Sequence, residues 1–234
     1  MEVEALGIHP ARRTLRRLLG MTVPFFWLHV KKAGGTSFRA TFTPPYVQSD
    51  RKAPRPFSEA PKAEWNDMVN NFRIPLGEYD FRRLLFARDH LYGAEEFSRM
   101  FRFVIVRNPY DRALSCWRYL TGGDGGSMGL ERFLESLPEE WASKRNRHLA
   151  THTAPVWPDI TDDEGNLLVD VIYKLEEIES ALPDLCGRLG VDARSLEHTN
   201  ASEGKTLHDE VLTPRAKALV ESLYADDLRG LGYG

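Results

Sequence analysis

The chain has 234 residues, 31 basic and 34 acidic side chains, a net charge of −3 and a hydrophobic fraction of 42%. This length and composition predict a single α/β domain over residues 1–234, with a basic N-terminal segment over residues 1–21; two smaller domains are the alternative. The balanced charge argues against a nucleic-acid-binding protein. Any affinity for anions must come from local clusters of arginine and lysine.

Cysteine, histidine and hydropathy patterns exclude three further classes of protein. Cys116 and Cys186 are too few for a disulfide framework, so we expect a reduced, cytoplasmic protein. The seven histidines show no metal-ligand spacing, and we expect no metal site. The longest apolar run, around residues 23–30, is far short of the ~20 residues that span a bilayer, so we expect no integral membrane segment.

The stretch from Phe25 to Phe42 organises the first half of the chain. It reads F-F-W-L-H-V, then K-K-A-G-G-T-S, then F-R-A-T-F, which predicts a buried strand, a glycine turn and a helix that ends before Pro44-Pro45. Backbone N–H groups of such a turn can bind an anion. The alternative is a structural turn with incidental lysines. The spacing G-x-x-x-x-G-K-[ST] of the nucleoside-triphosphate P-loop is absent.

The next segments are less regular. Residues 43–64 are rich in proline and charge and predict an irregular surface segment, either flanking a substrate cleft or acting as a linker. The run L-L-F-A at residues 84–87 predicts a second strand. His90 would then lie just beyond the carboxyl end of that strand, where a histidine could act as a general base; a surface histidine is the alternative.

A third strand and its following helix carry the clearest pattern. Phe101 to Val106 is apolar and ends at Arg107, after which N-P-Y-D-R-A-L-S-C-W begins a helix with Asn108 as its N-cap. Arg107 at the strand end and Ser115 two turns into the helix could hold one phosphate together. The alternative pairs Arg107 with a surface acid.

The remaining elements follow from turn residues and helical spacing. In chain order we expect a glycine-rich loop at residues 121–129, a short helix from Glu131 to Leu137 ended by Pro138, a basic stretch from Trp141 to His152, a strand from Val169 to Lys174, a helix closed by Gly190, and a final amphipathic helix from Thr213-Pro214.

Two of these motifs resemble those of sulfotransferases that use 3′-phosphoadenosine-5′-phosphosulfate (PAPS). K-x-G-G-T-S resembles the loop that binds the 5′-phosphosulfate, and R-N-P-Y-D-R-A-L-S-C-W resembles the signature whose arginine and serine hold the 3′-phosphate. The resemblance, closest to the family-2 carbohydrate sulfotransferases of the Golgi type, implies a P-loop-like three-layer sandwich with a central, mainly parallel sheet. It also implies PAPS as the donor and chemistry without a metal. The implied donor-binding residues are Lys32, Ala33, Gly34, Gly35, Thr36, Ser37, Arg107 and Ser115.

The same resemblance implies catalytic roles. Lys32 would stabilise the leaving oxygen, and His90 would be the base, with Glu95 or Glu96 as its competitor. The basic stretch before the last strand would place Arg145, Arg147 and His148 near the acceptor, with a solvated surface as the alternative. His198 to Lys205 would cover the nucleotide. The chain departs from the family loop at Lys31 and Ala33, where proline and threonine are usual.

The leading hypothesis is therefore transfer of a sulfuryl group to a hydroxyl, most simply that of a carbohydrate. Tyrosine or a small-molecule alcohol is the alternative acceptor. A P-loop nucleotide-binding relative, such as a kinase, is a second class, although the missing G-K-[ST] spacing argues against it. A non-catalytic protein that binds glycans or anions is a third class, and the set Lys32, Arg107, Ser115 and His90 argues against it.

Overall fold

The computed structural model describes residues 23–43, 45–122, 128–192 and 212–234. Four of the short elements are 3-10 turns (η1, η2, η3 and η6), and η4 is a π-helix. In chain order the elements are β1 (Phe25–Leu28), α2 (Gly35–Thr41), η1 (Phe57–Glu59), η2 (Lys62–Glu64), α3 (Trp65–Val69), η3 (Gly77–Tyr79), α4 (Arg83–Phe86), η4 (Ala87–Tyr92), α5 (Ala94–Ser98), β2 (Phe101–Val106), α6 (Pro109–Thr121), α7 (Leu130–Ser143), α8 (Arg147–Thr153), α9 (Trp157–Ile160), β3 (Val171–Lys174), η6 (Leu175–Glu177), α10 (Ile178–Leu189), α12 (Pro214–Leu223) and α13 (Ala225–Gly230).

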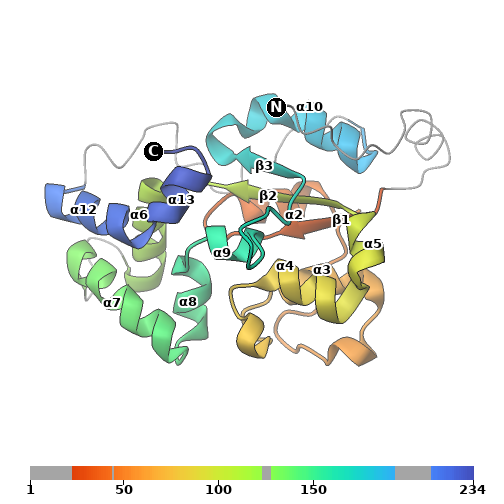
Figure 1. Cartoon of the computed structure of the whole chain (residues 1–234), viewed down its shortest axis with the longest axis horizontal. Helices are drawn as coiled ribbons and strands as arrows, with labels where there is room; N and C mark the ends of the chain where they lie inside the picture. The colour runs from red at the N-terminus through yellow and green to blue at the C-terminus, as the bar shows by residue number, and fades with distance from the viewer. Residues whose placement is uncertain (1–22, 44, 123–127, 193–211) are drawn as a thin grey trace.

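The three described strands form one parallel sheet in the order β1-β2-β3. Phe25 pairs with Phe101, and Phe103 pairs with Val171. All three strands lie within stretches that were predicted as strands, and the apolar runs of β1 and β2 suit strands that are buried on both faces. Because the strands are parallel, their carboxyl ends share one edge of the sheet, and α6, α8, α12 and α13 gather at that edge (Figure 1).

Alternate strand residues point to opposite faces of the sheet, and each face is covered by helices. Trp27, Phe103 and Ile105 pack with residues of α2 and α10 on one face. Phe26 and Val104 pack on the other face with residues of α4, α5 and α9. The sheet is therefore the middle layer of an α/β sandwich, which confirms the predicted fold class.

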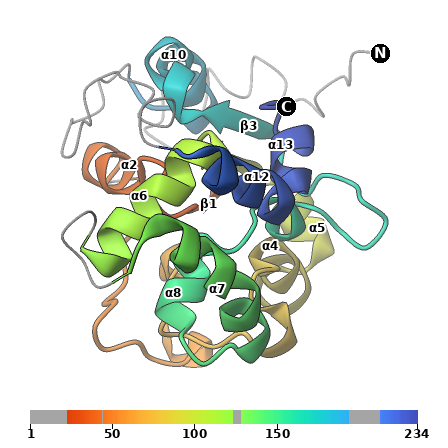
Figure 2. The same ribbon diagram turned by 90° about the vertical axis from the view of Figure 1, so that its left-hand side faces the viewer.

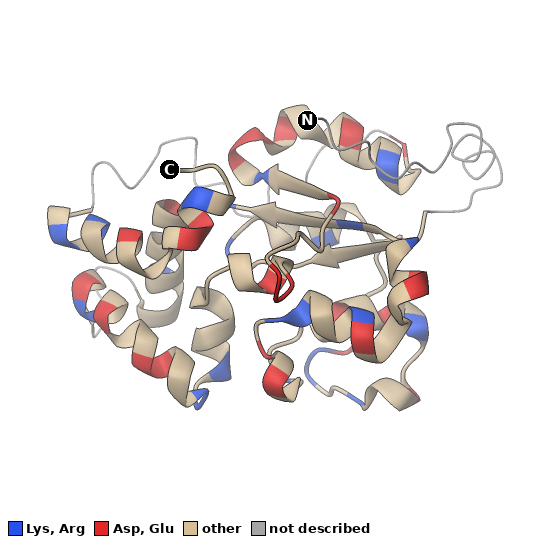
Figure 3. Ribbon diagram, viewed as in Figure 1, with Lys and Arg blue, Asp and Glu red and all other residues tan. Residues whose placement is uncertain are grey.

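A third apolar cluster lies beside the sheet, where α6, α7 and α12 pack together (Figure 2). Trp117 of α6, Leu134 of α7 and Val220 of α12 are all buried there. On the outer sides of α7 and α12, basic and acidic residues are interleaved (Figure 3). The cluster holds α6 firmly in place at the carboxyl edge of the sheet.

The outer edge of β1 is closed by two asparagine side chains from α3 and its C-cap. Asn66 accepts a hydrogen bond from the backbone N–H of Trp27 (3.1 Å) and donates to its carbonyl (2.9 Å). Asn70 accepts from the N–H of His29 (2.9 Å) and donates to the same Trp27 carbonyl (2.9 Å). The two amides thus supply the hydrogen bonds that a neighbouring strand would otherwise make.

Two predicted elements are wrong. Residues 84–87, expected as a strand, belong to α4 and the π-helix η4. The helix expected to end before Pro138 instead continues as α7 to Ser143, with the proline inside it. Packing explains the second case, because Phe133, Leu134 and Leu137 are fully buried and hold α7 against α12 and α8.

Other expectations are confirmed or lie outside the described residues. The described part of segment 43–64 is irregular apart from the short turns η1 and η2, and α10 ends at Gly190 in the left-handed conformation. Residues 1–21, most of the loop 121–129 and the stretch 198–205 lie outside the described ranges. No helix within those ranges is long and apolar enough to cross a membrane.

Candidate functional site

The glycine turn after β1 is built from its backbone. Lys32 and Gly34 both have left-handed φ values, 65° and 75°, and Gly34 is the N-cap of α2 with no side-chain hydrogen bond. A Cβ atom at Gly35 would lie 1.8 Å from Nε2 of His29. Glycine at position 35 therefore lets the buried imidazole, which stacks on Trp27 at 4.7 Å, pack directly beneath the turn.

The two adjacent lysines of the turn have different surroundings. Lys31 is buried, and its ammonium contacts Nδ1 of His29 (3.2 Å) and donates to the carbonyl of Asn70 (3.1 Å). Burial, and then the positive charges of Arg51 and Arg83, hold the pKa of Lys31 well below its ordinary value. Lys31 therefore stabilises the turn through these buried contacts with His29 and Asn70. They give a lysine a structural role at the position where the sulfotransferase loop usually has proline.

Lys32 points out of the turn toward α6. It is half-buried, and its Nζ lies 4.5 Å from the centre of the Tyr119 ring. Such a cation–π contact orients the ammonium without neutralising its charge. Lys32 is therefore the lysine of the pair that remains available to a ligand.

Helix α6 begins as predicted. The Asn108 side chain accepts from the N–H of Tyr110 (3.0 Å), and Pro109 occupies the first helical position. Arg112, Cys116 and Tyr119 recur at helical spacing on the side of α6 that meets the glycine turn.

Arg112 joins three segments around the site. It is buried; its Nε donates to the carbonyl of Lys31 (3.4 Å), and its Nη2 donates to the carbonyls of His152 (3.0 Å) and Ala154 (2.8 Å). Because these partners belong to the glycine turn and to α8, Arg112 fixes both against α6. Neither sequence motif had assigned a role to Arg112.

The positive charges of Arg107 and Lys32 both affect the pKa of the buried Cys116 thiol. Burial raises the pKa of the Cys116 thiol, while the positive charges of Arg112, Lys32 and Arg107 oppose that rise. All three cations therefore lie within electrostatic reach of one point on α6. Arg107 is half-buried and has no hydrogen-bond or ion-pair partner within the described parts of the chain. Ser115, one residue before Cys116, is also half-buried.

The structure carries His90 away from the glycine turn. Arg83, at the start of α4, donates to the carbonyl of His29 at the carboxyl end of β1 (3.1 Å). Tyr92, at the end of η4, contacts the ring of Phe26 near the amino end of that strand (6.1 Å). Residues 83–92 thus run antiparallel to β1, and the sheet-edge position expected for His90 is wrong because no strand precedes it.

The three predicted bases, His90, Glu95 and Glu96, contact residues outside the glycine turn. His90 is exposed and its ring contacts Tyr79 and Phe86. Glu95 of α5 pairs with Arg99 at the end of that helix, and Glu96 pairs with Lys62 of η2; both ion pairs are exposed. Their catalytic roles stay predictions that position does not support.

Two histidines of α8 lie beside Tyr119 instead. The His152 ring stacks on Tyr119 at 5.1 Å, and His148 contacts the same ring at 5.9 Å and His152 at 4.4 Å. Burial lowers the pKa of His152 to about 3, and its Nδ1 bonds the carbonyl of His148 (2.7 Å). Burial, Arg73 and Lys31 also lower the pKa of His148, which is only partly buried.

The other two predicted acceptor residues have different surroundings. Arg147 pairs with Asp80 and donates to the carbonyls of Phe72 (3.1 Å) and Ile74 (2.9 Å), which is a structural arrangement. Arg145 is exposed. Of the three predicted acceptor residues, only His148 thus contacts Tyr119, the ring beneath the Lys32 ammonium.

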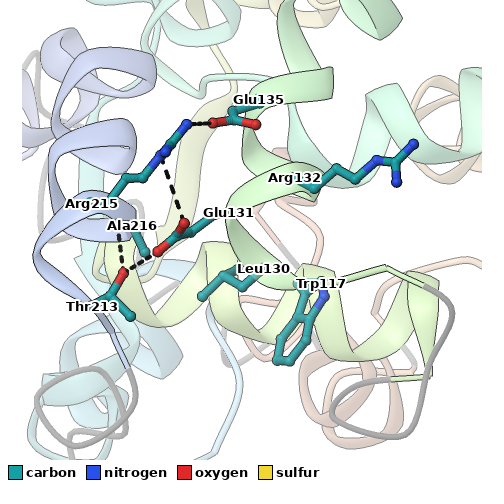
Figure 4. A pocket seen from close by; sticks show the side chains of 9 residues that line it. Trp117, Leu130, Glu131, Arg132, Glu135, Thr213, Arg215 and Ala216 are labelled. Atoms are coloured by element: carbon teal, nitrogen blue, oxygen red, sulfur yellow. Dashed lines mark hydrogen bonds and ion pairs between the residues drawn. The ribbon is translucent and has the colours of Figure 1, made fainter.

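A cavity of about 540 Å³ lies on the other side of α6, between α7 and α12 (Figure 4). Trp117 lines it, and Arg215 reaches between Glu131 and Glu135 to pair with both. Because Trp117 and Tyr119 are two residues apart on a helix, they point to different sides. This cavity is therefore separate from the Lys32 site, and its paired charges neutralise one another.

A scan against protein-family models matches residues 22–234 to the sulfotransferase family. The match covers both strand-to-helix turns described above, and the chain belongs to this family. It is accordingly a sulfotransferase. Comparisons with the curated proteins and with the solved structures give no match.

Proposed function

We propose that the protein moves the sulfuryl group from PAPS to a hydroxyl of a carbohydrate. The observation that supports this proposal is that Lys32 and Arg107, which follow two different strands, both lie within electrostatic reach of the Cys116 thiol of α6. PAPS is anionic at its 5′-phosphosulfate and at its 3′-phosphate. Two cations from two different strand ends therefore suit its two ends.

The glycine turn would hold the 5′ end of the donor, through the backbone N–H groups of residues 34–37. Arg107 and Ser115 would hold the 3′-phosphate. In the reaction, the acceptor oxygen bonds to sulfur while the bond from sulfur to the bridging oxygen breaks, and that electron pair stays on the 5′-phosphate. Lys32 would stabilise this developing charge.

The acceptor hydroxyl must lose its proton, and geometry favours His148 over His90 as the base. His148 contacts Tyr119, whose ring lies under the Lys32 ammonium, whereas His90 lies toward the amino end of β1. Because burial lowers the pKa of His148, the imidazole is neutral near pH 7 and can accept a proton.

A carbohydrate acceptor is supported by the aromatic rings beside His148. Phe72 lies 4.7 Å from the His148 ring, and Tyr119 is 54% exposed. Exposed aromatic rings can pack against the apolar faces of sugars. Phenolic and small alcohol acceptors fit the same chemistry, and a screen with labelled donor separates them from glycans. The cytoplasmic localisation of the protein stays a prediction.

The test measures binding of adenosine 3′,5′-bisphosphate by calorimetry and turnover with PAPS. We expect Arg107→Ala to weaken binding roughly 10- to 100-fold, and Lys32→Ala to lower kcat by ~10²- to 10³-fold with a smaller effect on binding. Magnesium-dependent ATP binding, without bisphosphate binding, would overturn the proposal. His148→Gln should abolish turnover and His90→Gln should not; the reverse result would restore His90 as the base.

A further inference from the structure

A glutamate lies beside Arg107 at the carboxyl edge of the sheet, and both of its oxygens are engaged. Glu176 follows β3, and its Oε1 accepts from the backbone N–H of Asn108 (2.7 Å), the residue next to Arg107. Its Oε2 accepts from the hydroxyl of Tyr233 (2.8 Å). The acid is therefore held by two donors and does not pair with Arg107.

The segment that carries Tyr233 is itself fixed. The N–H of Tyr233 donates to the carbonyl of Leu228 (2.8 Å), and the ammonium of Lys174 donates to the carbonyl of Gly232 (2.7 Å). The same ammonium lies 4.4 Å from the centre of the Tyr233 ring. Backbone and ring contacts thus place the phenol, and its hydroxyl is left to hold Glu176.

Arg107 directly precedes Asn108, whose N–H binds Glu176, and its charge also reaches Tyr233. The pKa of Tyr233 is raised by burial and by the charges of Glu176 and Glu177, and the positive charge of Arg107 opposes this rise. A carboxylate released from the Tyr233 hydroxyl would be free to pair with Arg107, the residue next to Asn108. In such a pair the carboxylate would compete with an anionic ligand for Arg107, and its negative charge would also repel that ligand.

We propose that Tyr233 is a positioning residue for donor binding: its hydroxyl holds the Glu176 carboxylate at the start of α6 and so leaves Arg107 open to the 3′-phosphate. This inference rests on the proposed function, because it assigns Arg107 to that phosphate. The predicted competitor of the donor is therefore a residue of the protein itself.

The experiment compares Tyr233→Phe, Glu176→Gln and the double variant with the wild type. Tyr233→Phe keeps the ring and its contact with Lys174 and removes only the hydroxyl. We expect it to weaken adenosine 3′,5′-bisphosphate binding roughly fivefold in calorimetry. The double variant should recover wild-type affinity, because a neutral glutamine forms no ion pair with Arg107 and does not repel the phosphate. Tyr110→Phe is the matched control. Tyr110 lies in the first turn of α6 and its hydroxyl donates to a different acid, Glu221 (3.0 Å), so this variant should leave binding unchanged.

A second ligand separates positioning from simple structural damage. Adenosine 5′-monophosphate lacks the 3′-phosphate, so its affinity should be the same in Tyr233→Phe and in the wild type. Equal losses for both ligands, or no recovery in the double variant, would overturn the inference while leaving the proposed function intact. If the wild type fails to bind the bisphosphate at all, the proposed function fails instead.

Discussion

The two strand-to-helix junctions at the carboxyl edge have the same topology but are built differently. The β1–α2 junction uses glycines, a left-handed Lys32 and a buried His29, and its helix has no side-chain cap. The β2–α6 junction uses an Asn108 cap and Pro109, and projects the side chain of Arg107. In the proposed donor site, one junction would bind an anion through its backbone and the other through side chains. The first should therefore tolerate less change in shape, and the second less change in charge.

The largest expected effect comes from Arg112, which ties the two junctions together. Arg112→Ala removes three hydrogen bonds and leaves the buried Asp227 carboxylate, 3.9 Å away, without its cation. Removing one partner from a buried charge pair costs about 3–5 kcal/mol. Urea unfolding should show this loss. A loss of less than about 1 kcal/mol in the free energy of unfolding would mean that Arg112 does not couple the two junctions.

The glycine junction should fail on a single added methyl group. Gly35→Ala places a Cβ against the imidazole of His29, and overpacking of this kind costs about 1–3 kcal/mol. Chemical denaturation of the variant measures the cost. Gly187→Ala on α10 is the control, because a Cβ there meets nothing within 4 Å and alanine favours a helix. Equal stability in the two variants would contradict the close packing of His29.

Acid should weaken the glycine junction before the other. Burial and neighbouring cations hold the pKa of His29 well below its ordinary 6.5 in the folded protein. The unfolded chain therefore takes up this proton first, so stability is present above about pH 6.5 and falls as pH drops, by up to about 1.4 kcal/mol per unit. His29→Gln should reduce the slope between pH 6.5 and 5. An unchanged slope would assign it to other groups, such as His152.

The smallest effect is expected at the cap of α6. Asn108→Ala removes the acceptor for the N–H of Tyr110, a change that costs about 1 kcal/mol. Thermal unfolding should detect it, while Asn108→Asp, which keeps an acceptor, should stay near the wild type. A loss as large as that of Gly35→Ala would remove the contrast between the two junctions.

Local signals account for what the sequence could predict. The buried strands, the Asn108 cap and the end of α10 at Gly190 each depend on residues that lie next to one another in the chain. The run at residues 84–87 misled because four apolar residues suit a buried helix as well as a strand. Its helical form depends on Arg83, which pairs with Asp159 far along the sequence (2.6 Å).

The site itself depends mostly on distant contacts. Lys32 meets Tyr119, Arg112 bonds the carbonyl of His152, and nothing in the spacing of these residues predicts either contact. The motifs therefore located the two strand-to-helix turns correctly along the chain, and anion binding at these turns stays a prediction. They could not show which histidine would lie beside them, because α8 reaches Tyr119 only through tertiary packing.

The asparagine amides along β1 have a consequence for how the protein behaves in a crowded solution. An unprotected border strand invites another polypeptide to extend the sheet, which is how many folded proteins begin to polymerise. Here Asn66 and Asn70 already satisfy the backbone of Trp27 and the N–H of His29. The strand that leads into the glycine turn is thus shielded from fibre-like growth at its outer border.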